Sequence, residues 1–124
     1  MAIPHNARLK AFVATVVPET AKLFYRDVLG FKLLSEDKYA LQFEASGTLL
    51  RIAIVNGFTP YPFTVLGWDV DDIEAVIRSL NNKNVIFEKY SFLEQNELGV
   101  WNSGEAKVAW FKDPDGNVLS LTQY

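Results

Sequence analysis

Few side chains in this sequence have the chemical types that catalysis or metal binding requires. His5 is the single histidine, and its place near the amino terminus predicts an exposed residue rather than a ligand or a member of a Ser-His-Asp set. The chain has no cysteine, which excludes thiolate metal ligands and a cysteine nucleophile. Glu44 and Asp69 are the carboxylates on central predicted strands, and neither has an evident partner for acid–base catalysis. Without a Ser-His-Asp set covalent catalysis is not expected, and without a glycine-rich phosphate loop nucleotide binding is not expected.

The three tryptophans are expected to have different roles. Trp68 alternates with Leu66 on the strand face that meets a helix, which predicts a core position. Trp101 lies in a long connection, Tyr90–Glu105, where an exposed aromatic side chain can close over a pocket. Trp110 adjoins a predicted hairpin and can face either side of its strand; we place it toward the ligand.

The first half of the chain has the pattern of a strand, a helix and three strands. Leu9–Val17 is rich in β-branched and aromatic residues, and Pro18 after it suits the first turn of a helix. Apolar residues recur at intervals of three and four over Glu19–Leu29, and Gly30 stands where a left-handed cap belongs. The elements expected next are Phe31–Ser35, Tyr39–Ala45, a turn at Ser46-Gly47, and Leu49–Val55.

The second half repeats this order. Thr64–Val70 alternates as a strand, and Asp71 is expected to cap a helix whose apolar face begins at Ile73. Asp113–Asn117, with its proline and glycine, predicts a tight turn between two strands. The remaining predicted strands are Val85–Tyr90, Val108–Lys112 and Val118–Thr122. The repeat divides one domain, residues 1–124, into modules over residues 7–56 and 63–124.

Two motifs make the chain resemble the vicinal oxygen chelate superfamily of glyoxalases, bleomycin-resistance proteins and extradiol dioxygenases. They are Phe24-Tyr25-Arg26-Asp27-Val28-Leu29-Gly30-Phe31 and Phe111-Lys112-Asp113-Pro114-Asp115-Gly116-Asn117, and the resemblance covers nearly the whole chain. It implies an α+β fold in which two β-α-β-β-β modules form one curved, mostly antiparallel eight-stranded sheet, with helices on the convex face and a ligand on the concave face. The motif residues themselves serve helix capping and turn formation.

Metal-dependent members of this superfamily carry His, Gln or Glu ligands on the first and last strand of each module. The matching positions here are Lys10 or Ala11, Arg51, Val65 and Ser120, and none of these is a usual ligand of a divalent ion. The resemblance therefore implies a member without a metal site and without a cofactor. Chemistry that uses the ion as a Lewis acid or template is not expected.

Binding groups take the place of metal ligands at these positions. Arg51 and Lys10 would bring positive charge, and a guanidinium can hold a carboxylate or phosphate through two hydrogen bonds. The alternative for Arg51 is an ion pair with Glu44 across the hairpin of residues 43–52. The predicted ligand-binding set is Arg51, Gln42, Trp101, Trp110, Ser120, Thr122 and Lys10. For its amide and hydroxyl members, ordinary polar alternation on a partly solvated strand is the alternative.

Composition limits the partners of this chain. Its 12 basic and 15 acidic residues give a net charge of −3, and no long basic run could follow a phosphate backbone, so nucleic acid is not expected as a partner. No apolar stretch approaches the roughly 20 residues of a membrane span, so we expect a soluble, cytoplasmic protein without a membrane partner. An aromatic content of 14% favours a hydrophobic pocket.

These observations favour a metal-independent small-molecule-binding protein of the bleomycin-resistance type, with an anionic or aromatic ligand in an aromatic-lined cup. The alternative is an enzyme of the glyoxalase and dioxygenase superfamily, acting as a lyase, isomerase or dioxygenase. A third interpretation is a module that serves mainly in dimerisation or regulation. The resemblance also implies a homodimer, because related proteins commonly assemble their cups across subunits.

Overall fold

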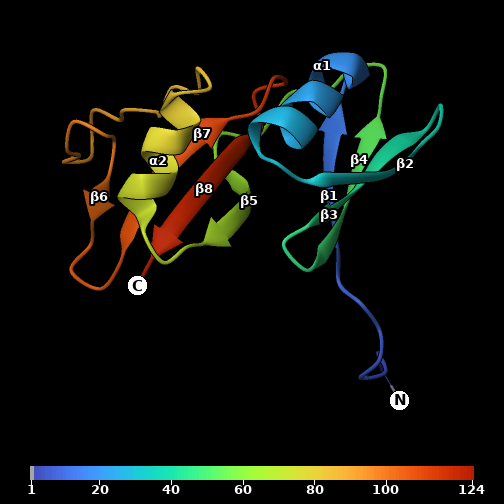
Figure 1. The fold of residues 1–124 in the computed structure, drawn as a ribbon, viewed down its shortest axis with the longest axis horizontal. Coiled ribbons are helices and arrows are strands. Elements are labelled where there is room, and N and C mark those ends of the chain that lie inside the picture. Colours follow the sequence, from blue (N-terminus) through green and yellow to red (C-terminus); the bar gives the residue numbers. More distant parts are fainter. Residues whose placement is uncertain (1) are drawn as a thin grey trace. The chain divides into compact units, whose positions relative to one another are not determined.

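The computed structural model describes residues 2–124, which fall into two compact units, the first ending at Phe58 and the second beginning at Thr59 (Figure 1). Each unit contains a strand, a helical segment and three more strands in chain order, as the repeat predicts. The strands of each unit form a four-stranded mixed sheet. The structure therefore shows an α+β fold with two β-α-β-β-β modules. That the two sheets make one curved sheet within one domain stays a prediction.

The first unit holds a sheet with the strand order β1-β4-β3-β2, in which β1 and β4 are parallel and the other pairs are antiparallel. Its elements are β1 (Lys10–Thr15), α1 (Pro18–Leu23), the π-helical segment η1 (Phe24–Val28), β2 (Lys32–Glu36), β3 (Ala40–Ala45) and β4 (Thr48–Ile54). The predicted helix thus changes type after Leu23, because the Leu29 N–H donates to the Phe24 carbonyl, five residues earlier, at 2.9 Å. Gly30 follows with a φ of 81°, as predicted for the residue that ends the helix.

Alternation along the strands gives the first sheet two different faces. Tyr25 of η1 packs against Phe43 of β3 with ring centroids 6.0 Å apart, and both side chains are buried. Leu50 and Ile52 of β4 are buried as well, so the helical segments cover this face. Successive side chains of a strand point to opposite faces, so Arg51 between them lies on the other face. The first sheet therefore has one apolar, buried face and one face that carries polar groups.

The second unit holds a sheet with the order β5-β8-β7-β6, in which β5 and β8 are parallel. Its elements are β5 (Thr64–Asp69), α2 (Ile73–Asn81), β6 (Trp101–Asn102), β7 (Lys107–Lys112) and β8 (Val118–Gln123). Trp68 is half-buried and pairs in register with the buried Leu121, which confirms its predicted position on the core face. Within residues 2–124 no helix has the length and apolar character needed to cross a membrane.

The start of α2 differs from the prediction by one residue. Asp72, not Asp71, is the N-cap, and its carboxylate accepts a hydrogen bond from the Ala75 N–H at 3.1 Å. The prediction of Asp71 is wrong because an N-cap side chain accepts from an N–H two or three residues later, and here the Asp72 carboxylate, on an extended backbone, does so. Ile73 and Ile77 of α2 are buried, so this helix covers one face of the second sheet.

The predicted strand Val85–Tyr90 is wrong. This segment is joined to β7 by the Glu88 N–H, which donates to the Trp110 carbonyl at 2.8 Å, and it forms no ladder. The place beside β7 belongs instead to β6, which comes later in the chain. The alternation that suggested a strand reflects burial on one side, since Phe87 is buried while Ile86 is 80% exposed. One-sided burial gives the same period in an extended segment that pairs with nothing.

Candidate functional site

The registers of the second sheet bring four predicted binding residues onto one face. Trp110 of β7 pairs with Ser120 of β8, and Val108 pairs with Thr122 on one side and with Trp101 of β6 on the other. Register partners point to the same face of a sheet. Trp101, Trp110, Ser120 and Thr122 therefore share the face opposite α2, and the open orientation of Trp110 is settled toward that face.

Four aromatic rings continue along this face as one group, which we call the aromatic row: Trp101, Trp110, Tyr90 and Phe92. The indoles of Trp101 and Trp110 lie 6.2 Å apart between centroids. Tyr90 meets Trp110 edge to face at 5.6 Å, and Phe92 stacks on Tyr90 at 5.5 Å. The first three rings are half-buried, whereas Phe92 is 80% exposed. Partly exposed, mutually supported rings provide a rigid apolar surface for a planar molecule.

Tyr90 adds a polar group to the aromatic row, and a glycine keeps a neighbouring part of the face open. Burial, and after it the charge of Glu88, raises the pKa of Tyr90 above its ordinary value of 10.0, so its hydroxyl stays protonated and can donate a hydrogen bond. Gly67 of β5 pairs with Ser120, and a Cβ at Gly67 would clash with the Ser120 hydroxyl oxygen. The glycine therefore leaves this part of the face without a side chain, beside Ser120, whose register partner on the other side is Trp110.

Gln95 fastens the segment that carries Tyr90 to the segment that leads into Trp101. Its side-chain oxygen accepts from the Tyr90 N–H at 2.7 Å, and its amide nitrogen donates to the carbonyls of Glu88 and Gly99 at 2.9 and 2.8 Å. Gln95 and Trp101 also form an isolated antiparallel bridge. Trp101 itself lies in β6, so the expectation that it belongs to an irregular connection is wrong. A strand of two residues has no periodicity that a sequence could reveal.

Three side chains form a row across the first sheet. Phe12 of β1 pairs with Arg51 of β4, and Arg51 pairs with Gln42 of β3. Lys10 lies on the same face, whereas Ala11 pairs with the buried Leu50 on the other face. The sequence analysis missed Phe12, which is 60% exposed. Its sequence neighbours Ala11 and Val13 are apolar as well, so only the pairing with β4 distinguishes its face.

The structure contradicts an ion pair between Arg51 and Glu44. Glu44 pairs in register with Leu49, and its carboxylate accepts a hydrogen bond from the Gly47 N–H. Among residues 2–124, no carboxylate pairs with the Arg51 guanidinium, and no side-chain hydrogen bond involves it. Its charge does reach Asp37, whose pKa is lowered chiefly by hydrogen bonds from backbone N–H groups and to a smaller extent by Arg51. The guanidinium is therefore available to an anionic ligand.

The positions that hold metal ligands in the resembling proteins do not fit a divalent ion here. Arg51 and Lys10 are cationic, Val65 is apolar, and Ser120 offers a single neutral hydroxyl. Within the described residues, no three His, Asp or Glu side chains lie close enough together to hold a metal ion.

The sequence profile of the Glyoxalase/Bleomycin resistance protein/Dioxygenase superfamily matches residues 8–121. The chain belongs to this superfamily, as its two motifs predicted. No curated protein matches the sequence.

Solved structures with the same fold include both binding proteins and enzymes. An antibiotic-binding protein, TnmS3 from Streptomyces sp. CB03234, is 28% identical, with a TM-score of 0.69 over 99% of this chain and 98% of that chain. A glyoxalase family protein from Enterococcus faecalis is 25% identical, with a TM-score of 0.69 over 98% of this chain and 99% of that chain. A lactoylglutathione lyase from Agrobacterium tumefaciens, 15% identical, has a TM-score of 0.71 over 98% and 96% of the two chains and shows the fold alone.

Proposed function

We propose that this protein binds a small, planar, partly aromatic molecule without the help of a metal ion, and that the aromatic row holds it. The observation that carries the proposal is the contact of Trp101, Trp110 and Tyr90 on one sheet face, next to the hydroxyls of Ser120 and Thr122. Small-molecule sites combine apolar and aromatic walls with a few polar groups that fix orientation. The full-length similarity to an antibiotic-binding protein supports the same function.

In the first unit, Arg51 is a separate candidate for recognition of an anionic group. It lies between Phe12 and Gln42 in register, and its guanidinium has no carboxylate partner among the described residues. An exposed aromatic ring and an amide on either side of a guanidinium suit an aromatic carboxylate or phosphate. Lys10 adds a second positive charge to the same face.

The residue types favour binding over catalysis. Lyase, isomerase or dioxygenase chemistry in this superfamily is the alternative, and it would need three donors at positions that hold Arg51, Val65 and Ser120. A homodimeric state and a cytoplasmic location stay predictions from the sequence. Light scattering on the purified protein tests the first of these.

The proposal is tested by a thermal-shift screen of small planar aromatic compounds, with bleomycin as an additional compound, followed by calorimetry on those that raise the melting temperature. Trp110→Leu and Trp68→Leu form a matched pair, because both residues are half-buried in the second sheet but on opposite faces. Both variants are expected to lose stability, and Trp110→Leu alone is expected to lose binding, by about tenfold or more. Equal affinity in the two variants would contradict the role of the aromatic row.

A further inference from the structure

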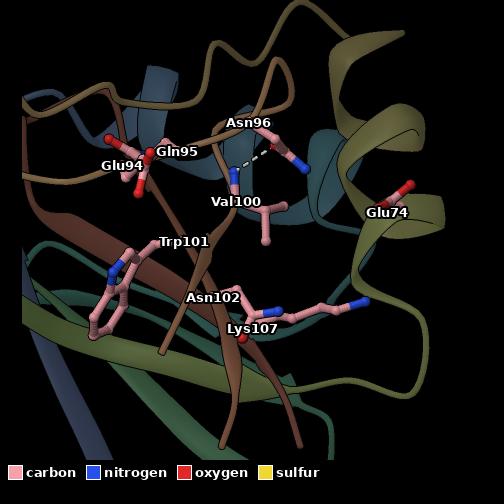
Figure 2. Close-up of a pocket in the computed structure, with 8 residues that line it drawn as sticks. All are labelled: Glu74, Glu94, Gln95, Asn96, Val100, Trp101, Asn102 and Lys107. Carbon is pink, nitrogen blue, oxygen red and sulfur yellow. Dashed lines mark hydrogen bonds between the residues drawn. The ribbon is translucent and has the colours of Figure 1, made fainter. Parts of the chain in front are cut away.

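A pocket of about 570 Å³ lies at one end of the second sheet, between α2 and the strands β6 and β7 (Figure 2). Its volume is in the range of small-molecule sites. Trp101 contributes one wall, and the polar groups around the pocket include Glu74, Glu94, Asn96, Asn102 and Lys107. Binding of a planar molecule on the aromatic row, as proposed above, does not account for this group of charged and amide side chains.

Two of the amides have a fixed orientation. The side-chain oxygen of Asn96 accepts from the N–H groups of Leu98 and Val100 at 3.0 and 2.9 Å. The side-chain oxygen of Asn102 accepts from the Gly104 N–H at 2.9 Å. With both oxygens engaged by the backbone, each residue presents its NH₂ group as the remaining side-chain donor. The pocket is therefore lined by two amide donors whose positions the loops determine.

Lys107 adds a cationic donor to the same pocket. Its side chain is half-buried and extends toward α2, as Figure 2 shows. Within residues 2–124 its ammonium group forms no ion pair and no hydrogen bond. An ammonium group and two amide NH₂ groups facing one space are suited to a carboxylate.

The carboxylates of the pocket require a ligand that also carries positive charge. Glu94 lies on the far side of Val100 from the Lys107 ammonium (Figure 2). Glu74 on α2 has one long contact, 3.7 Å, to Arg78. These two acids would repel a purely anionic ligand, and Lys107 would repel a purely cationic one. We propose that the pocket binds a small zwitterion of the amino-acid or dipeptide type, with its carboxylate at Lys107, Asn96 and Asn102 and its ammonium at Glu94.

The test follows the Asn96 and Asn102 side-chain amides of the full chain by ¹H–¹⁵N NMR. The probes are L-glutamine and glycylglycine, with acetate and ethylamine as singly charged controls. The two zwitterions are expected to shift the NMR signals of both side-chain amides saturably. The singly charged controls are expected to leave these signals in place. No shift with either zwitterion at millimolar concentration, or an equal response to acetate, would overturn the proposal.

Three variants separate the charges from the fold. Asn96→Asp keeps the oxygen that accepts from the backbone but replaces the donor by a negative charge. Asn96→Asp, Lys107→Met and Glu94→Gln are each expected to weaken binding of glycylglycine by about tenfold or more, without loss of melting temperature. Lys38→Met, in the first unit, is expected to leave binding of glycylglycine unchanged. Glycylglycine has no aromatic ring, so the result does not depend on the proposed function. Unchanged affinity in Lys107→Met would refute the site.

Discussion

The indole rings of Trp101 and Trp110 lie 6.2 Å apart, tilted by 31°, on neighbouring strands of the second sheet. The pairing of Trp101 with Val108, two residues before Trp110, places the two side chains on one face. The Gln95 side chain is hydrogen-bonded to the backbone of Glu88 and Tyr90 and to that of Gly99, so it joins the two ends of the segment that precedes Trp101. The spacing of the two rings therefore depends on a glutamine that does not belong to the aromatic row.

Gln95→Leu is expected to lower the free energy of unfolding by about 2–3 kcal/mol, because it removes three hydrogen bonds to partly buried backbone groups. Hydrogen exchange at the Tyr90 amide, which loses its acceptor, should accelerate more than exchange in β8. Denaturant unfolding and exchange measured by NMR check both effects.

Gln42→Leu is the matched control for this substitution. Gln42 is half-buried as well, but its described side-chain bond is a single long one, to the Ser35 hydroxyl at 3.4 Å. Its loss should cost less than about 1 kcal/mol. Similar costs for the two glutamines would show that Gln95 does not fasten the loop.

Sequence patterns were sufficient to predict elements that have either a regular alternation of apolar and polar residues or a distinctive turn. The turn at Ser46-Gly47 has φ angles of 59° and 90°, a conformation that glycine and small polar residues favour, and the adjoining strands have clear alternation. The order of elements in both units followed from such signals. Alternation in a regular strand also placed Ser120 and Thr122 on one face, whereas the face of Trp110 needed the register of β7 with β8.

The elements and site residues that could not be predicted from the sequence depend on pairing between distant segments. Val85–Tyr90 has the alternation of a strand, yet the two residues of β6 take the position beside β7. Phe12 could not be predicted as a neighbour of Arg51, because that depends on how β1 pairs with β4. In this pairing Phe12, and not Lys10, lies opposite Arg51. Alternation identifies a face within one strand, but only the register identifies neighbours across strands.

Arg51→Met is expected to weaken binding of anionic compounds from the aromatic screen by about 1.5–3 kcal/mol and to leave neutral ones unaffected. The methionine keeps the packing of the aliphatic stem and removes the charge. Because Arg51 has no ion pair among residues 2–124, stability should change by less than about 0.5 kcal/mol. Calorimetry checks the affinities, with Arg8→Met as the control; an equal loss for neutral compounds would assign Arg51 a packing role.

The purified protein is expected to carry no stoichiometric divalent ion, because Lys10, Arg51, Val65 and Ser120 hold the positions of the ligands. Elemental analysis of protein prepared without chelators measures this. About one zinc, nickel, manganese or iron ion per chain, removed only by a chelator, would contradict the expectation and favour the enzymatic alternative.

Asp37 is expected to contribute to the acid dependence of stability. Its carboxylate accepts from the N–H groups of Tyr39 and Ala40 at 2.8 and 3.0 Å, which lowers its folded-state pKa below the ordinary value of 3.8. The contribution is therefore present above that value and is lost as the pH falls through the lower folded-state pKa. Asp37→Asn keeps an accepting oxygen without the charge, so its stability should fall less steeply between about pH 5 and pH 2 than that of the parent protein. Identical slopes would contradict this role.

The most direct test of the proposed function follows the three indole N–H signals of the protein by ¹H–¹⁵N NMR during titration with the tightest planar aromatic compound from the screen. Single Trp→Phe variants assign the signals. The signals of Trp101 and Trp110 are expected to shift together and saturably, whereas the signal of Trp68, on the face that α2 covers, stays in place. Saturable binding that moves Trp68 and leaves Trp101 and Trp110 unchanged would contradict the assignment of the aromatic row as the ligand site.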